Sequence, residues 1–194
     1  SAQSTDDAST HSAGWPGLGS GSTAQEVQQS LEQGPQLDRN LSALDLIEQR
    51  RRLDEALARL APQRAGRVDA YVVSIALDSD PVFAREAREV AQVLERRYNA
   101  QSRTLVLAGP DGQDDLPRGS IRSLLISLAR IAQKMDADED VLVLYSTSHG
   151  LPQGLAYHYE DDGYGVLSPK LLADTFAELG IEKRLLLISA CYSG

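Results

Sequence analysis

Hydrophobic residues are sparse at the start of the chain. From residue 1 to about residue 39, Ser, Gly, Gln and Ala dominate, and Trp15 is an isolated large apolar side chain. So little apolar surface cannot offset the entropy that a chain loses on ordering. We therefore expect a flexible arm over residues 1–39. Trp15 either anchors that arm on the domain surface or stays in solvent, and the pattern leaves both alternatives open.

The next segment, residues 40–62, has a helical period. Its apolar side chains recur every three or four residues, at Leu41, Leu44, Ile47, Leu53, Leu57 and Leu60. This spacing predicts an amphipathic helix. Asn40 precedes it and is the expected N-cap, because Asn side chains accept hydrogen bonds from the first backbone amides of a helix.

After Gly66, short apolar runs alternate with helical stretches. The runs predict strands at residues 68–77, 104–108, 141–145 and 184–188. Helices are expected between them, starting at Pro81, Ser120 and Ser168-Pro169, and an alternating segment predicts a hairpin over residues 155–166. Apolar strands separated by helices are typical of a parallel sheet buried on both faces. The expected fold class over residues 67–194 is therefore α/β, with a mostly parallel central sheet and helices on both faces.

Composition excludes several function classes. The chain has 28 acidic and 19 basic residues, a net charge of −9, so we expect no nucleic-acid partner. No apolar run approaches the roughly 18 to 20 residues that span a bilayer. One cysteine excludes an internal disulfide. Zinc-type spacings, a phosphate loop and a dinucleotide glycine motif are all missing from the sequence, so we expect neither a metal nor another cofactor.

Two reactive side chains follow neighbouring predicted strands. His149 comes after the strand at 141–145, and Cys191 comes after the strand at 184–188. Reactive groups in open parallel sheets gather at the carboxyl ends of the strands. A thiol with an ordinary pKa of about 8.5 needs a nearby base to become a nucleophile. We therefore predict that His149 is the base and Cys191 the nucleophile, with the backbone N–H groups of Gly150 and Cys191 as an oxyanion hole.

The motifs around these residues resemble a known family. Residues 141–150 end in Ser-Thr-Ser-His-Gly and resemble the histidine strand of legumains and of the GPI transamidase catalytic subunit. Residues 186–194, Leu-Leu-Ile-Ser-Ala-Cys-Tyr-Ser-Gly, resemble their cysteine strand. Caspases are a weaker match, because the glutamine that precedes Ala-Cys in their signature is absent here. The resemblance covers residues 68–194 and implies a caspase-like three-layer sandwich. It also implies a cysteine endopeptidase that works through an acyl-enzyme on a peptide or protein substrate, without a cofactor.

The resemblance also implies a specificity pocket. In legumain-like enzymes, an arginine early in the helix after the first strand shapes the pocket for the residue before the cleaved bond. Arg88 matches that position best, and Arg85 is the alternative one turn earlier; an exposed arginine paired along its own helix is an equally open interpretation. Ser189 stands where the family has an acidic residue, which removes one acceptor from the pocket. Cleavage after Asn or another polar residue is the resulting expectation.

Several alternatives stay open. Caspase-like domains continue beyond the cysteine, so we expect a further C-terminal segment or a second processed chain to complete the pocket. The competing hypothesis is a catalytically inactive caspase-like binding or scaffold module, in which Cys191 is an inert apolar residue. The residues do not separate hydrolysis from transpeptidation, and they predict no oligomeric state. Family habit suggests a periplasmic, secreted or membrane-anchored protein with a soluble domain.

Overall fold

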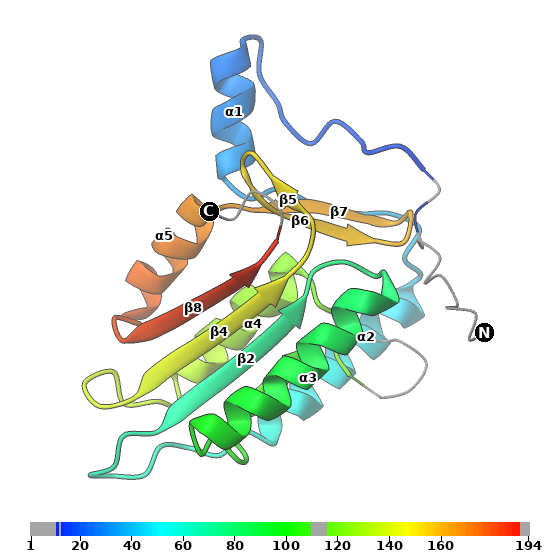
Figure 1. Cartoon of the computed structure of the whole chain (residues 1–194). Helices are drawn as coiled ribbons and strands as arrows, with labels where there is room; N and C mark the ends of the chain where they lie inside the picture. The colour runs from blue at the N-terminus through cyan, green and yellow to red at the C-terminus, as the bar shows by residue number, and fades with distance from the viewer. Residues whose placement is uncertain (1–10, 12, 110–115, 191–194) are drawn as a thin grey trace, which may run out of the picture.

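The protein is an α/β protein built around a parallel sheet (Figure 1). The computed structural model describes residue 11 and residues 13–109 and 116–190. Within them, four parallel strands follow the order β3-β2-β4-β8. Their bounds are Ala70–Ala76 for β2, Thr104–Leu107 for β3, Val141–Thr147 for β4 and Arg184–Ser189 for β8. The predicted parallel sheet is thus confirmed.

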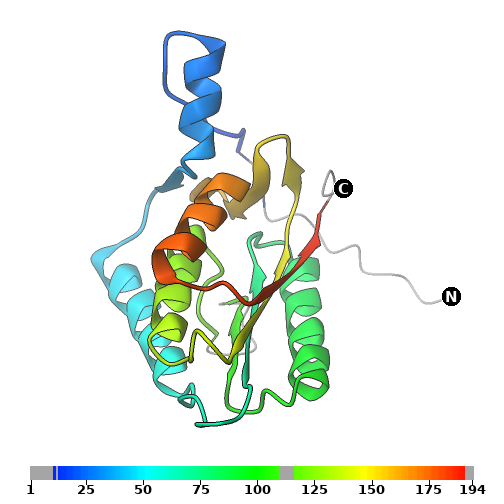
Figure 2. The same cartoon turned by 90° about the vertical axis from the view of Figure 1, so that its left-hand side faces the viewer.

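Helices cover both faces of this sheet (Figure 2). On one face lies α3 (Pro81–Arg97), and on the other lie α2 (Ala43–Ala58), α4 (Ile121–Ala132) and α5 (Pro169–Leu179). Tyr71, Val73 and Ile75 of β2 belong to the larger core on the second face, whereas Val72 and Ala76 pack with residues of α3. Because both faces are covered, β2 is apolar along nearly its whole length.

The predicted helix boundaries after residue 80 have visible causes. Pro81 occupies the first turn of α3, where its missing N–H removes no helical hydrogen bond. Ser120 caps α4, and its hydroxyl accepts from the Ser123 amide. Gly180 ends α5 with a φ of 67°, a left-handed conformation that glycine adopts without strain.

A small antiparallel sheet lies beyond the carboxyl ends of β2 and β4 (Figure 1). Its order is β1-β7-β6-β5, with bounds Gln36–Asp38, Gly163–Leu167, Gly154–Tyr159 and Gly150–Leu151. Strands β6 and β7 form the hairpin predicted over residues 155–166. The His158 amide donates to the Leu77 carbonyl at 2.9 Å, so the hairpin is joined to the end of β2.

The N-terminal segment contains elements that we did not expect. Residues Ala24–Glu32 form α1, whose cap Thr23 makes a reciprocal pair with Glu26, and β1 pairs with β7. This corrects the expectation of a flexible arm over 1–39 for residues 24–38. The reason is that β1 obtains its backbone hydrogen bonds from a partner more than 120 residues later in the chain.

The second helix also differs from the prediction at its start. Its N-cap is Ser42, whereas Asn40 has a φ of 55° and lies before the helix. Leu53 and Leu57 are buried, but Leu44 is 76% and Ile47 65% exposed. Only the second half of the predicted apolar stripe therefore reaches the core.

The outer strand β8 is the least covered part of the parallel sheet. Leu186 is 38% and Ile188 46% exposed, and both line a cavity of about 310 Å³ with Phe176 of α5. Within residues 13–109 and 116–190, no strand pairs with the free edge of β8. No described helix is both long enough and apolar enough to span a membrane.

Candidate functional site

The carboxyl ends of β4 and β8 lie side by side, as the sequence predicted. Thr147 and Ser189 are opposite each other in the parallel register, and the Ser148 amide donates to the Ser189 carbonyl at 3.2 Å. His149 follows directly after this register, at the sheet edge. Cys191 lies outside the described residues. Gly150 begins β5 and pairs with Leu155.

A buried carboxylate stands next to His149. Asp78 follows β2 and is only 4% exposed, and its Oδ2 is 3.9 Å from Nε2 of His149. That distance is too long for a hydrogen bond but suits an ion pair when the imidazole is protonated. Oδ2 has no hydrogen-bond partner among the described residues, whereas Oδ1 accepts from the Asp80 amide at 2.8 Å. Phe83 also contacts His149: the two rings are edge-on, and their centroids are 5.0 Å apart.

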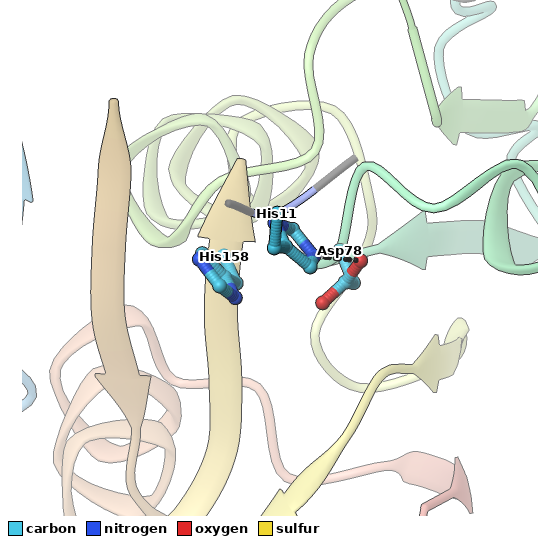
Figure 3. A group of neighbouring side chains, drawn as sticks. All are labelled: His11, Asp78 and His158. Atoms are coloured by element: carbon cyan, nitrogen blue, oxygen red, sulfur yellow. Dashed lines mark hydrogen bonds and ion pairs between the residues drawn. The ribbon is translucent and has the colours of Figure 1, made fainter. Parts of the chain in front are cut away.

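The same carboxylate holds a second histidine (Figure 3). His11 Nε2 is 2.9 Å from Asp78 Oδ1, and its Nδ1 is 3.0 Å from the Glu160 carbonyl. The His11 ring stacks on that of His158 with a centroid separation of 3.4 Å and an angle of 8°. Trp15 lies edge-on to His158 at 5.0 Å, so it anchors the N-terminal segment on the domain surface. This was one of the two alternatives for Trp15.

The stacked histidines differ in their protonation behaviour. Burial lowers the pKa of His11, but the hydrogen bonds to Asp78 and Glu160 and the charges of Asp78 and Asp80 outweigh it, so the pKa is raised above 6.5. Burial, followed by the charge of His11, lowers the pKa of His158 below 6.5. Between these two pKa values, a charged His11 ring stacks on a neutral His158 ring, which avoids repulsion between two cations.

The cluster of His11, Asp78 and His158 contains side chains of the kinds that bind metal ions, but their arrangement does not suit a shared ion. The ligand atoms of His11, Asp78 and His158 lie within 4.8 Å of one another. An imidazole binds a metal ion along its ring plane, and planes that are nearly parallel and 3.4 Å apart at their centroids do not converge on one ion. The arrangement in Figure 3 is therefore that of a hydrogen-bonded stack.

Glu86 joins α3 to the carboxyl ends of β4 and β8. Its carboxylate accepts from Thr147 Oγ1 at 2.7 Å and from Ser189 Oγ at 3.0 Å. Burial raises the pKa of Glu86, but the facing hydroxyls of Tyr145, Thr147 and Ser189 together lower it by more. The pKa therefore lies below its usual value. An ionised carboxylate thus stands at this sheet edge at neutral pH.

The predicted pocket residues divide into two groups. Ser189 lies at the strand end and contacts Glu86, whereas Arg85 is exposed and Arg88 half-buried on α3. No described contact brings either arginine to His149, and their role stays a prediction. The sequence interpretation missed Asp78, Glu86 and His11. Asp78 had one available signal, since it also follows a predicted strand at its carboxyl end.

Comparison with known proteins adds no assignment to this geometry. No family model matches the chain, and a search of curated proteins finds no significant match. The chemical interpretation therefore depends on the site itself: an imidazole beside a buried carboxylate, an ionised glutamate and two hydroxyls, all at the carboxyl edge of a parallel sheet.

Proposed function

We propose that the protein is a cysteine endopeptidase of the legumain type, with His149 and Cys191 as its catalytic dyad. The observation that carries this proposal is the register of β4 and β8. Thr147 is opposite Ser189, and His149 and Cys191 each come two residues later. Two residues span at most about 7 Å, and this short reach supports a dyad in which the thiol of Cys191 meets the imidazole of His149.

The proposed reaction is acyl transfer. His149 accepts the thiol proton of Cys191, and the sulfur forms a bond to the carbonyl carbon of the peptide while the carbonyl electrons move to its oxygen. The N–H groups of Gly150 and Cys191 hold that oxyanion. The intermediate then collapses, the C–N bond breaks, and the leaving amine takes the proton from His149. Water, activated by the same imidazole, releases the acyl group.

Asp78 supports His149 in this reaction. When His149 carries the proton, its Nε2 faces a buried carboxylate oxygen 3.9 Å away that lacks another described partner. The charge of Asp78 acts at short range there, because a buried negative charge is screened less than an exposed one. Asp78 is thus a positioning and charge-stabilising residue and makes no contact with the substrate in this scheme.

The caspase-like three-layer sandwich is also part of the proposal. A parallel sheet with α3 on one face and α2, α4 and α5 on the other supports it. In this scheme Arg88 or Arg85, with Ser189, contributes to the pocket for the residue before the cut.

A thiol-reactivity experiment tests the dyad. Cys191 is the single cysteine, so iodoacetamide labelling measures that one thiol. We expect the native protein at pH 7 to label at least tenfold faster than the same protein unfolded in urea, because a neighbouring base raises the thiolate fraction. His149→Ala should remove this acceleration, and Cys191→Ala should abolish both labelling and peptide cleavage. Equal labelling rates for native and unfolded protein would contradict the proposal.

A second candidate function is a peptide-binding module. The exposed Leu186 and Ile188, with the adjoining cavity of about 310 Å³, favour it, because apolar strand edges recruit extended peptides. A folded protein that cleaves no member of a peptide library and whose Cys191 shows no enhanced labelling would support the module over the enzyme.

A further inference from the structure

We propose that Glu86 makes the site select a cationic residue, arginine or lysine, immediately before the cleaved bond. This inference depends on the proposed peptidase function and specifies its substrate class. It replaces the broader expectation of an asparagine or other polar residue with a charged one. Glu86 is a specificity-determining residue in this scheme.

The position of Glu86 is the first argument. Its carboxylate is hydrogen-bonded to Thr147 and Ser189, which form the last registered pair of β4 and β8. The proposed base and nucleophile each follow that pair by two residues. Thr147 is two residues before His149, and two residues span at most about 7 Å, so the carboxylate lies close behind the proposed base. A long side chain next to the attacked carbonyl can bridge such a separation.

The charge of Glu86 is the second argument. The hydrogen bonds described for its carboxylate come from neutral hydroxyls, and these leave the negative charge uncompensated. A carboxylate has about four lone-pair sites, so capacity remains for a further donor. Glu86 is half-buried, which weakens solvent screening of an incoming cation. A guanidinium can bind such a carboxylate through charge-assisted hydrogen bonds.

The third argument is where the acid comes from. In the motif that this chain resembles, an acidic residue precedes Ala-Cys, and here that residue is Ser189. The Ser189 hydroxyl donates to Glu86 at 3.0 Å, so α3 brings a carboxylate to this position of β8.

The test compares substrates that differ only in charge. Fluorogenic peptides would carry arginine, citrulline, lysine, asparagine or aspartate before the cut, and citrulline is an uncharged analogue of arginine with nearly the same shape. For the full chain, we expect kcat/KM for arginine to exceed that for citrulline at least tenfold. Glu86→Gln should bring this ratio close to one, because the carboxylate charge is lost. Glu86→Asp should retain part of the preference.

Glu89→Gln is the matched control. Glu89 is an exposed acid on the same helix, and its loss should leave the arginine to citrulline ratio unchanged. If Glu86→Gln fails to fold, the salt dependence of the wild-type ratio replaces it: the ratio should fall as ionic strength rises. A wild-type ratio near one, a preference for asparagine or aspartate, or a ratio independent of both Glu86 and salt would overturn the inference.

The two proposals fail in different ways. Cleavage without a cationic preference would overturn the role of Glu86 and leave the peptidase proposal standing. Absence of cleavage together with unaccelerated labelling of Cys191 would overturn the peptidase proposal, and the inference about Glu86 with it.

Discussion

Asp78 is shared between two histidines that come from distant parts of the chain. Its Oδ1 is hydrogen-bonded to His11, and its Oδ2 faces His149 at 3.9 Å. Asp78 is almost completely buried. Because Asp78 loses its hydration on burial, its contact with His11, whose side chain is 12% exposed, contributes more than an exposed ion pair would. The His149 side chain is 56% exposed, so its contact with Asp78 is weaker.

Replacing Asp78 by asparagine removes this charge while keeping the side-chain size. We expect Asp78→Asn to lower kcat about tenfold to a hundredfold, part of the roughly 10²–10⁴ that a positioned acid-base group contributes, with little change in KM. Steady-state kinetics on one peptide measures both constants.

Asp161→Asn separates this effect from loosening of the N-terminal segment. Asp161 accepts the Ala13 amide at 2.7 Å, so its substitution disturbs the same segment without touching His149. If Asp161→Asn lowers kcat as much as Asp78→Asn does, Asp78 does not act through His149.

The sequence could not predict individual contacts of this kind. His11 and Glu160 are 149 residues apart, and no periodicity links them. His149 and Cys191 became candidates because each follows an apolar strand and carries a reactive side chain. Glu86 occupies an ordinary helical position, and its contact with Ser189 depends on how α3 sits on the sheet.

At the scale of elements, the N-terminal segment is attached through a titratable stack. His11 stacks on His158, and Trp15 packs against His158 and Tyr164. The acidic groups Asp78, Asp80 and Asp161 face the two imidazoles. The pKa values of the two imidazoles shift in opposite directions, so the strength with which the N-terminal segment is attached depends on pH.

The sign of each shift gives the predicted pH profile. The raised pKa of His11 strengthens attachment as pH falls toward 6.5, and this gain is lost as pH rises through the raised value. The lowered pKa of His158 weakens attachment as pH falls below 6.5 toward the lowered value. Attachment should therefore be strongest near pH 6.5. Trp15 is the single tryptophan, so its fluorescence anisotropy reports attachment directly.

His11→Gln provides the control for that profile. Attachment of the N-terminal segment in this variant should not strengthen as pH falls from alkaline values to 6.5, because the titrating side chain of that segment is absent. An anisotropy that is flat with pH in the wild-type protein, or identical in His11→Gln, would contradict the prediction.

Elements with a local cause were predictable, and elements with a distant cause were not. Pro81, Ser120 and Gly180 mark their helices in the sequence, and the observed boundaries agree within a few residues. Strand β1 is three residues long and exists because β7 pairs with it. Asn40 was the wrong N-cap, since Ser42 forms the reciprocal pair with Asp45.

At the scale of the whole molecule, the outer strand β8 leaves one edge of the parallel sheet open to association with other chains. Strand β8 presents Leu186 and Ile188 beside a free edge in the described part of the chain. Exposed apolar edge strands pair readily with other chains. The sequence could not reveal this, because a central strand and an outer strand have the same apolar pattern.

The isolated 194-residue chain should therefore self-associate. We expect its apparent mass in sedimentation or size-exclusion measurements to rise with concentration. Leu186→Lys combined with Ile188→Lys should suppress this rise, because charged side chains protect sheet edges.

Leu44→Lys is the matched control for that pair. Leu44 is more exposed than either β8 residue, at 76%, but it belongs to a helix and has no free strand edge beside it. Suppression by Leu44→Lys to the same extent would mean that general hydrophobicity, rather than the edge of β8, causes the association.

The pairing of β1 with β7 limits how the protein can be shortened. Residue 40 looks like a natural starting point, but a version trimmed there would lose Asp38, which accepts from the hydroxyl of the fully buried Tyr157 at 3.0 Å. It would also lose Gln36, whose side chain accepts from the Arg122 amide at the start of α4. Trimming before Gln36 keeps both anchors and retains all four strands of the small sheet at the carboxyl ends of β2 and β4.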